Sequence, residues 1–260
     1  MDIGVSSACF YPLETEEALV RTANLGVNTV EVFMNADSEF QDDYLNKLKA
    51  IKDEYKLNVA SVHTMASFTE SYYLFSSYKR RYYESIETLF KRHFDVMHKL
   101  DAKILVMHGI KIPGSIEDEE YFERFGNLIE MGKKEGLLVC QENVVHYRSE
   151  SPDFLLRMAN YIGDDFNMVF DIKQSVRTNV DPFYFAEKLS PYIRHIHISD
   201  NNSQRDCVVP FTEGTFDFKR FFSLMKSKGY DGNYILELYN NGFKDDKELI
   251  RAVEGLKNML

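Results

Sequence analysis

Short β-rich runs alternate with longer amphipathic runs along the whole chain. Apolar and β-branched residues typical of buried strands mark eight runs. They lie at 3–7, 28–33, 58–63, 103–108, 137–143, 167–171, 193–199 and 234–239. Apolar residues recur at helical spacing between and after them, for example at 15–26, 41–55, 78–100, 218–230 and 245–260. Eight strands alternating with eight helical segments predict an α/β fold, a single (β/α)8 TIM barrel over residues 1–260.

Length and composition agree with one large domain. The chain has 260 residues, 44% of them hydrophobic, which is enough to bury a sizeable core. No Pro-rich, Ser-rich or low-complexity linker divides the chain. A dinucleotide-binding open sheet is disfavoured because no GxGxxG motif follows the first predicted strand.

Charge and cysteine content narrow the partners and the compartment. The formal net charge is −10, which argues against a nucleic-acid partner because contacts to phosphates need basic residues. No signal-peptide pattern opens the chain, and no apolar run approaches the roughly 18 residues of a membrane span. The three cysteines form no CxxC motif. We therefore expect a cytoplasmic protein with no membrane partner.

The run IRHIHISD, residues 193–200, carries two histidines in an otherwise apolar strand. Strand alternation places His195 and His197 on the same side. The active sites of (β/α)8 barrels lie at the carboxyl ends of the strands. His197 is therefore expected in the site, and His195, lower in the barrel, is expected to pack or to support it.

Titratable residues recur at the ends of six consecutive predicted strands. They are His63, His108, Glu142, Asp171, His197 and Glu237. Burying so many titratable groups together is costly unless a cation or hydrogen bonds compensate. The pattern therefore predicts a ring of metal-type ligands on one rim of the barrel.

Six short motifs occur in order along the chain: LVMHG, CQEN, FDIKQ, HIHISD, PFTEGTFDF and ILELY. Together they resemble the successive motifs of the xylose isomerase-like barrel superfamily. That superfamily includes sugar and sugar-phosphate isomerases and epimerases, inosose-processing enzymes and DNA-repair endonucleases of the endonuclease IV class. The resemblance extends from the first predicted strand to the last.

The resemblance implies one shared divalent metal site, on Glu142, Asp171, His197 and Glu237. Three carboxylates and one imidazole favour Mn²⁺ in an isomerase, and Zn²⁺, Co²⁺ and Mg²⁺ stay open. The implied activity is a metal-dependent isomerase or epimerase of a small sugar, sugar phosphate or related polyol ketone. The reaction would proceed by proton transfer through an enediolate, with Glu142 and Glu237 as the two catalytic bases.

The endonuclease members of the superfamily provide the main alternative, a metal-dependent hydrolase or lyase. Their three-metal pattern is retained at His63, His108 and Glu142 but is broken where Gln174 and Val208 replace histidines. We expect His63 and His108 to hydrogen-bond a substrate hydroxyl, although a second metal there stays open. The Gln174 amide can also bind a sugar hydroxyl, but it cannot titrate.

Arg205 follows the strand at 193–199, in a loop expected to overhang the metal. It could bind a substrate hydroxyl or phosphate, or it could pair with Asp206. A third functional class, a non-catalytic sugar-binding barrel, would keep Arg205 and tolerate the loss of a glutamate. In each sugar-directed case the expected partner is a small molecule, and the sequence leaves the oligomeric state open.

Overall fold

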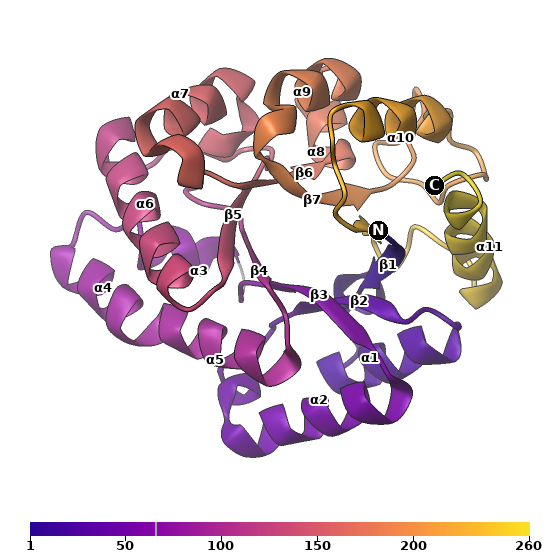
Figure 1. Ribbon diagram of the computed structural model, residues 1–260, viewed down its shortest axis with the longest axis horizontal. Coiled ribbons are helices and arrows are strands. Elements are labelled where there is room, and N and C mark those ends of the chain that lie inside the picture. The colour runs from indigo at the N-terminus through magenta and orange to yellow at the C-terminus, as the bar shows by residue number, and fades with distance from the viewer. Residues whose placement is uncertain (66) are drawn as a thin grey trace.

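The computed structural model describes residues 1–65 and 67–260. Within this part of the chain, eight parallel strands close into a barrel in sequence order, which confirms the predicted fold class (Figure 1). The strands are β1 (Ile3–Ser6), β2 (Thr29–Phe33), β3 (Asn58–His63), β4 (Ile104–Met107), β5 (Leu138–Glu142), β6 (Met168–Asp171), β7 (Ile193–Ile198) and β8 (Tyr234–Leu236). Each lies inside its predicted run.

Helices surround the barrel as an outer ring (Figure 1). They are α1 (Thr15–Asn24), α2 (Asp42–Tyr55), α3 (Ser67–Tyr72), α4 (Lys79–Glu84), α5 (Phe90–Leu100), α6 (Asp118–Lys134), α7 (Pro152–Ile162), α8 (Ile172–Arg177), α9 (Pro182–Leu189), α10 (Phe218–Ser227) and α11 (Asp246–Lys257). Their apolar faces pack on the outer face of the sheet and form the main core with it. The ion pair between Lys257 Nζ and Asp2 Oδ1, at 3.1 Å, joins the two ends of the chain.

Two helical features differ from the sequence pattern. The single helix expected at 78–100 consists of α4, a π-helical turn at Ser85–Leu89 and α5 in direct succession. A short helix, α8, follows β6 without a loop, because the Asp171 side chain accepts a hydrogen bond from the Gln174 N–H and caps the helix. This helix carries residues 173 and 174 onto the rim.

The interior of the barrel holds apolar and polar side chains next to one another. Val106, Cys140 and Val169 form a small apolar cluster separate from the main core. The register pairs His63 with Val106, and on the far side it pairs Asp171 with His197. Neighbouring strands thus deliver their carboxyl-end side chains to a common level, where the polar groups collect.

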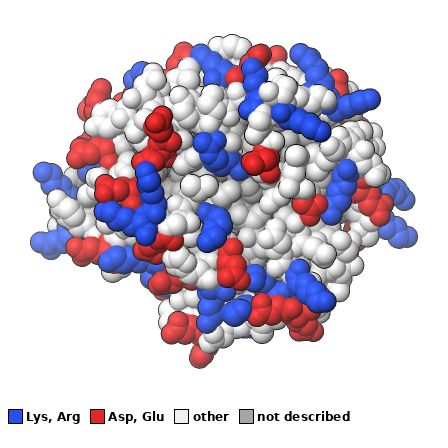
Figure 2. All heavy atoms as spheres, viewed as in Figure 1, with Lys and Arg blue, Asp and Glu red and all other residues white. Residues whose placement is uncertain are grey.

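The surface carries both signs of charge. Figure 2 shows basic and acidic side chains interspersed on the face that Figure 1 presents, with no continuous basic patch there. Across residues 1–65 and 67–260, no helix combines the length and the apolar character that a membrane crossing requires.

Candidate metal centre

Four side chains converge at the carboxyl ends of β5 to β8. Glu142, Asp171, His197 and Glu237 each offer one ligand atom, and these atoms lie within 4.8 Å of one another. Glu142 and Asp171 end their strands, whereas Glu237 directly follows β8 and is held by a hydrogen bond from its N–H to the Ile198 carbonyl. The group could hold a metal ion, with the donor set that the resemblance implied.

The orientation of His197 suits a ligand. Its Nδ1 lies 3.0 Å from Glu142 Oε1 and faces the carboxylates, while its Nε2 lies 2.9 Å from Glu31 Oε2. The pKa of Glu31 is well below its ordinary value: burial opposes ionisation, but the imidazole of His197 outweighs it. An ionised carboxylate only accepts, so Nε2 carries a proton. Burial opposes a charge on His197, yet the carboxylates of Glu31, Glu237 and Glu142 hold its pKa well above the ordinary value, so Nδ1 is protonated as well when no ion is bound. A metal ion at this position would replace the Nδ1 proton and be bound by Nδ1, as in many carboxylate–histidine–metal arrangements.

Glu31 is the central acceptor of the barrel interior, a position that sequence reasoning left without a role. Its carboxylate accepts hydrogen bonds from Ser6 and Ser61 and lies 3.2 Å from His195 Nε2. His195 thus contacts Glu31, and the packing or supporting role expected of it stays a prediction. The only signal in the sequence is one carboxylate in the otherwise apolar strand TVEVF.

The electrostatics of Asp171 test whether a cation fits here. Burial raises the pKa of Asp171 to about 7, and the carboxylates of Glu237 and Glu142 add to that rise. Among the described residues, its buried Oδ2 accepts no hydrogen bond of good geometry, although the Lys173 ammonium lies 3.3 Å away and opposes the rise in pKa. Three buried carboxylates beside a single lysine leave negative charge that a divalent cation would stabilise. The residues present fit a metal ion.

Lys173 is a second residue that sequence reasoning missed. Its Nζ lies 2.6 Å from Glu237 Oε2 and 3.3 Å from Asp171 Oδ2, and only 4% of the side chain is exposed. Burial opposes its charge, yet these two carboxylates hold its pKa well above the ordinary value. No sequence pattern singles out this lysine, because its inward position depends on the helix cap at Asp171.

His63, His108 and Glu142 form a neighbouring group whose ligand atoms also lie within 4.8 Å of one another. His63 Nδ1 donates to the Thr64 carbonyl, so its Nε2 faces His108 Nε2 at 2.9 Å. His108 Nε2 is also 3.0 Å from Glu142 Oε2. The geometry suits a second ion as well as a hydroxyl donor or acceptor on a substrate, so both hypotheses stand.

The other two predicted substrate-binding residues differ in position. Gln174 lines a pocket that Glu142 and Glu237 also line, and its Oε1 accepts a hydrogen bond from the Val145 N–H. Arg205 is exposed and pairs with Glu213, outside the residues that line this pocket. Asp206, the partner considered for Arg205, pairs instead with Arg177. A substrate-binding role for Arg205 stays a prediction.

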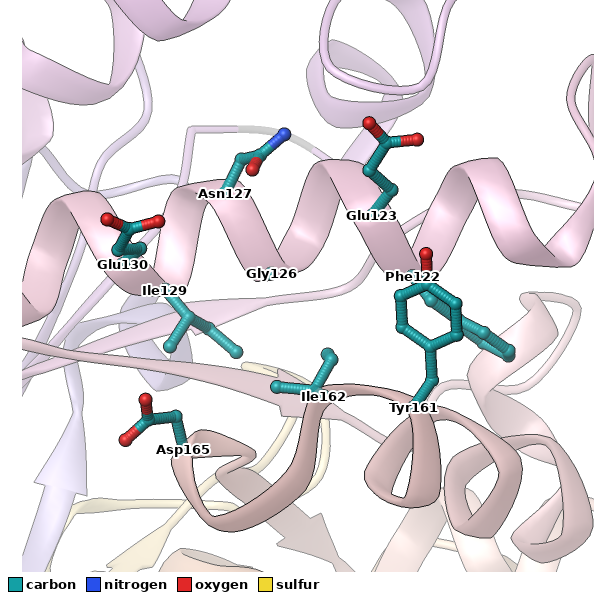
Figure 3. Close-up of a pocket in the computed structure, with 9 residues that line it drawn as sticks. All are labelled: Phe122, Glu123, Gly126, Asn127, Ile129, Glu130, Tyr161, Ile162 and Asp165. Carbon is teal, nitrogen blue, oxygen red and sulfur yellow. The ribbon is translucent and has the colours of Figure 1, made fainter.

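A pocket of about 270 Å³ is lined by two of the four ligand-type residues, Glu142 and Glu237. Its lining is Ala8, Tyr11, Phe33, His108, Glu142, Lys173, Gln174, Glu237, Leu238 and Tyr239. A second cavity, of about 330 Å³, lies between α6 and α7 on the outside of the barrel (Figure 3). There Ile129 and Ile162 point toward one another, away from the strand ends where barrel active sites form. The first pocket is therefore the candidate site.

Sequence comparison agrees with this fold. The family description Xylose isomerase-like TIM barrel matches residues 19–259, and the protein belongs to that family. An inosose dehydratase of Lacticaseibacillus casei is 24% identical over 192 residues, which is 60% of this chain and 63% of that enzyme. An L-ribulose-5-phosphate 3-epimerase of Escherichia coli is 37% identical over 67 residues, 25% of this chain and 24% of that enzyme.

Structural comparison points to the same group. A D-tagatose 3-epimerase-like protein superposes with a TM-score of 0.81 at 22% identity, covering 100% of this chain and 97% of that one. This likeness establishes the shared fold. The curated relatives named here are thus a dehydratase and a sugar-phosphate epimerase, each of which this chain matches over less than two thirds of its length.

Proposed function

We propose that this protein is a divalent-metal-dependent isomerase or epimerase of a small sugar, sugar phosphate or related polyol ketone. The observation that carries the proposal is the placement of Glu142 and Glu237. Both carboxylates line one pocket, and both reach the same His197 Nδ1, at 3.0 and 3.7 Å. They come from strands β5 and β8, which are not neighbours in the barrel. Two carboxylates can therefore approach one substrate from different sides.

The metal would be held by Glu142, Asp171, His197 and Glu237, with Mn²⁺ favoured by the donor set. Once bound, it would supply Lewis-acid polarisation of a substrate carbonyl, which acidifies the adjacent C–H. The volume of about 270 Å³ lies at the lower end of ligand pockets and suits a monosaccharide-sized substrate. His108 and Gln174 in the pocket wall can bind its hydroxyl groups.

The two glutamates then perform the proton transfers. One carboxylate removes the proton beside the carbonyl, giving an enediolate. The other, after taking up a proton from water, delivers it to the opposite face, and the first then releases its proton to water, which restores both groups. This inverts the carbon and is epimerisation. If only one glutamate is productive, it returns the proton from the same side to the neighbouring carbon of the enediolate, the former carbonyl carbon, and aldose–ketose isomerisation results. Burial opposes ionisation of both groups, yet the pKa of each lies below its ordinary value, because histidines surround Glu142 and the Lys173 ammonium contacts Glu237.

Lyase chemistry is the second candidate, favoured by the match to an inosose dehydratase. The first step would be the same proton removal beside a carbonyl. The hydroxyl group on the next carbon would then leave as water, with no return of the proton. Because the same side chains serve both reactions, only the product distinguishes them.

The decisive experiment uses the Mn²⁺-loaded protein and a panel of ketoses, ketose phosphates and inososes in D₂O. We expect the true substrate to gain deuterium at the carbon beside its carbonyl, as followed by NMR. Glu237→Gln should abolish turnover and retain sugar binding, whereas the Glu39→Gln control, a buried carboxylate near α2, should keep activity. Loss of water from the substrate would favour the lyase, and turnover without deuterium uptake would contradict the two-glutamate proposal.

A further inference from the structure

Lys173 places a second positive group inside the candidate metal centre. Its ammonium contacts Glu237 Oε2 at 2.6 Å and Asp171 Oδ2 at 3.3 Å. The same two oxygen atoms face His197 Nδ1, at 3.7 and 3.9 Å. A divalent ion ligated by this imidazole and these carboxylates would therefore use the oxygen atoms that the ammonium already contacts.

The charges of the carboxylates, the ion and Lys173 determine how the lysine affects ion binding. The three carboxylates of Glu142, Asp171 and Glu237 and one divalent ion would leave a single negative charge, which the lysine cancels. A lysine ammonium and a divalent ion around one oxygen atom also repel each other at short range. The lysine is therefore expected to weaken ion binding while it balances the charge of the loaded centre.

The position of Lys173 also gives it access to the substrate. It lines the pocket together with Gln174, its neighbour on α8. Its Nζ lies 5.2 Å from the centre of the Tyr239 ring, on the pocket wall. A small rotation of the long lysine side chain would turn the ammonium from Glu237 toward the pocket, where it could donate to a substrate oxygen.

We propose that Lys173 is a positioning residue that shares the Asp171 and Glu237 oxygens with the divalent ion and, with the ion bound, donates to an oxygen of the substrate. The substrate part of this inference rests on the proposed function. The part that concerns the ion does not, since it follows from the shared carboxylate oxygens alone. The two parts are therefore tested by separate measurements.

The first measurement is Mn²⁺ affinity by calorimetry, with no sugar present. Lys173→Met removes the ammonium and keeps the apolar stem, so it should tighten Mn²⁺ binding about tenfold or more. Lys173→Gln, which is uncharged but can still donate to Glu237, should also tighten it. Lys133→Met, which removes an exposed lysine paired with Asp165 on the outside of the barrel, controls for net charge and should leave the affinity unchanged. Unchanged or weaker Mn²⁺ binding in both Lys173 variants would overturn the sharing of oxygens.

A wild-type measurement keeps the test valid if these variants fail to fold. Reductive methylation followed by peptide mass spectrometry should label Lys173 faster with saturating Mn²⁺ than with chelator, while Lys133 is labelled equally. Equal labelling of Lys173 would contradict the turn of its ammonium from Glu237 toward the pocket when the ion is bound. For the substrate part, Lys173→Met should raise KM about tenfold, and an unchanged KM would overturn that part. If no sugar is turned over, the proposed function fails, and the Mn²⁺ comparison still decides the role of Lys173.

Discussion

Glu31 on β2 and His197 on β7 meet across the barrel, with 2.9 Å between Glu31 Oε2 and His197 Nε2. These strands are not neighbours in the sheet, so the contact exists only because the barrel is closed. The carboxylate keeps the Nε2 proton in place and points Nδ1 at the four-residue centre. Glu31 thereby orients a proposed ligand without contacting the other three.

This contact gives the first prediction. Glu31→Gln should weaken Mn²⁺ binding about 10- to 100-fold, the usual cost of losing a partner that orients a ligand histidine. His197→Ala should abolish measurable binding, and Glu39→Gln, another buried carboxylate, should bind as wild type does. The measurement is calorimetric titration of each purified variant. If Glu31→Gln binds like the wild type, His197 is not oriented through Glu31.

The strands and the ends of the strands could be predicted from the sequence, but the contacts across the barrel could not. Buried parallel strands appear as short apolar runs, so each titratable residue at the end of one of them stands out against its neighbours. Glu31 lies in the middle of such a run, and its partner is 166 residues away. No local pattern connects two residues whose distance is set by the closure of the whole sheet.

The side-chain positions of Lys173 and Arg205 could not be predicted from the sequence either, because one residue lies at a helix end and the other in a loop. Lys173 points inward because α8 begins without a loop at Asp171, a detail of the cap that a periodic pattern does not reveal. Arg205 lies in a loop at the expected place, but its guanidinium pairs with Glu213, and Arg205 does not line the pocket. Position along the chain thus predicts which residues lie at the rim of the barrel. Local ion pairs and hydrogen bonds determine which of their side chains reach the pocket.

The second prediction concerns pH. His93 on α5 is buried between a donated bond to the Leu89 carbonyl and an accepted bond from the Met65 N–H, and burial lowers its pKa to about 4. In the unfolded chain His93 takes up a proton near pH 6.5. The stability that the folded protein gains from a neutral His93 is therefore complete above that pH. It is lost as pH falls toward about 4, by up to about 3 kcal/mol.

The check is the free energy of unfolding from urea titrations between pH 7 and pH 4, all in the presence of chelator. His93→Gln should show a shallower decline than the wild type, because glutamine does not titrate. His98→Gln, a substitution of the exposed histidine paired with Glu135, should retain the wild-type decline. A wild-type decline in His93→Gln would assign the pH dependence to other groups.

The third prediction concerns Gly109, which follows His108 at the rim. Its φ is +92°, and an added Cβ would lie 2.0 Å from the Tyr121 hydroxyl oxygen. Gly109→Ala should therefore cost about 2–5 kcal/mol, from backbone strain and overpacking together. Gly136→Ala, also at positive φ but with nothing within 4 Å of its Cβ, should cost only about 1 kcal/mol.

A double-mutant cycle isolates the clash with the hydroxyl group. Tyr121→Phe removes the hydroxyl and leaves Gln141 without its donor, which has its own cost. Together with Gly109→Ala it should destabilise by at least about 1 kcal/mol less than the sum of the two single variants. Strict additivity in urea unfolding would mean that the hydroxyl is not what excludes a side chain at residue 109.

The last prediction distinguishes a substrate-binding role of His108 from a second metal. His108 is the more accessible of the two facing imidazoles, with 18% of its side chain exposed against none for His63. It also lines the pocket. A histidine placed this way can donate to a substrate hydroxyl while His63, packed on the Phe33 ring, holds it from behind. If so, His108 touches the sugar and is not itself a ligand of the ion at His197.

His108→Ala should then retain about one Mn²⁺ per chain and raise KM about tenfold or more, the effect of losing one hydrogen bond to the substrate. His98→Ala, an exposed substitution, should change neither quantity. Metal content after saturation and gel filtration is measured by mass spectrometry, and KM is measured with the sugar identified in the D₂O screen. A fall from two ions to one in His108→Ala would instead place a second metal between His63, His108 and Glu142. That outcome would favour hydrolase chemistry, because paired ions activate water and stabilise a leaving oxygen together.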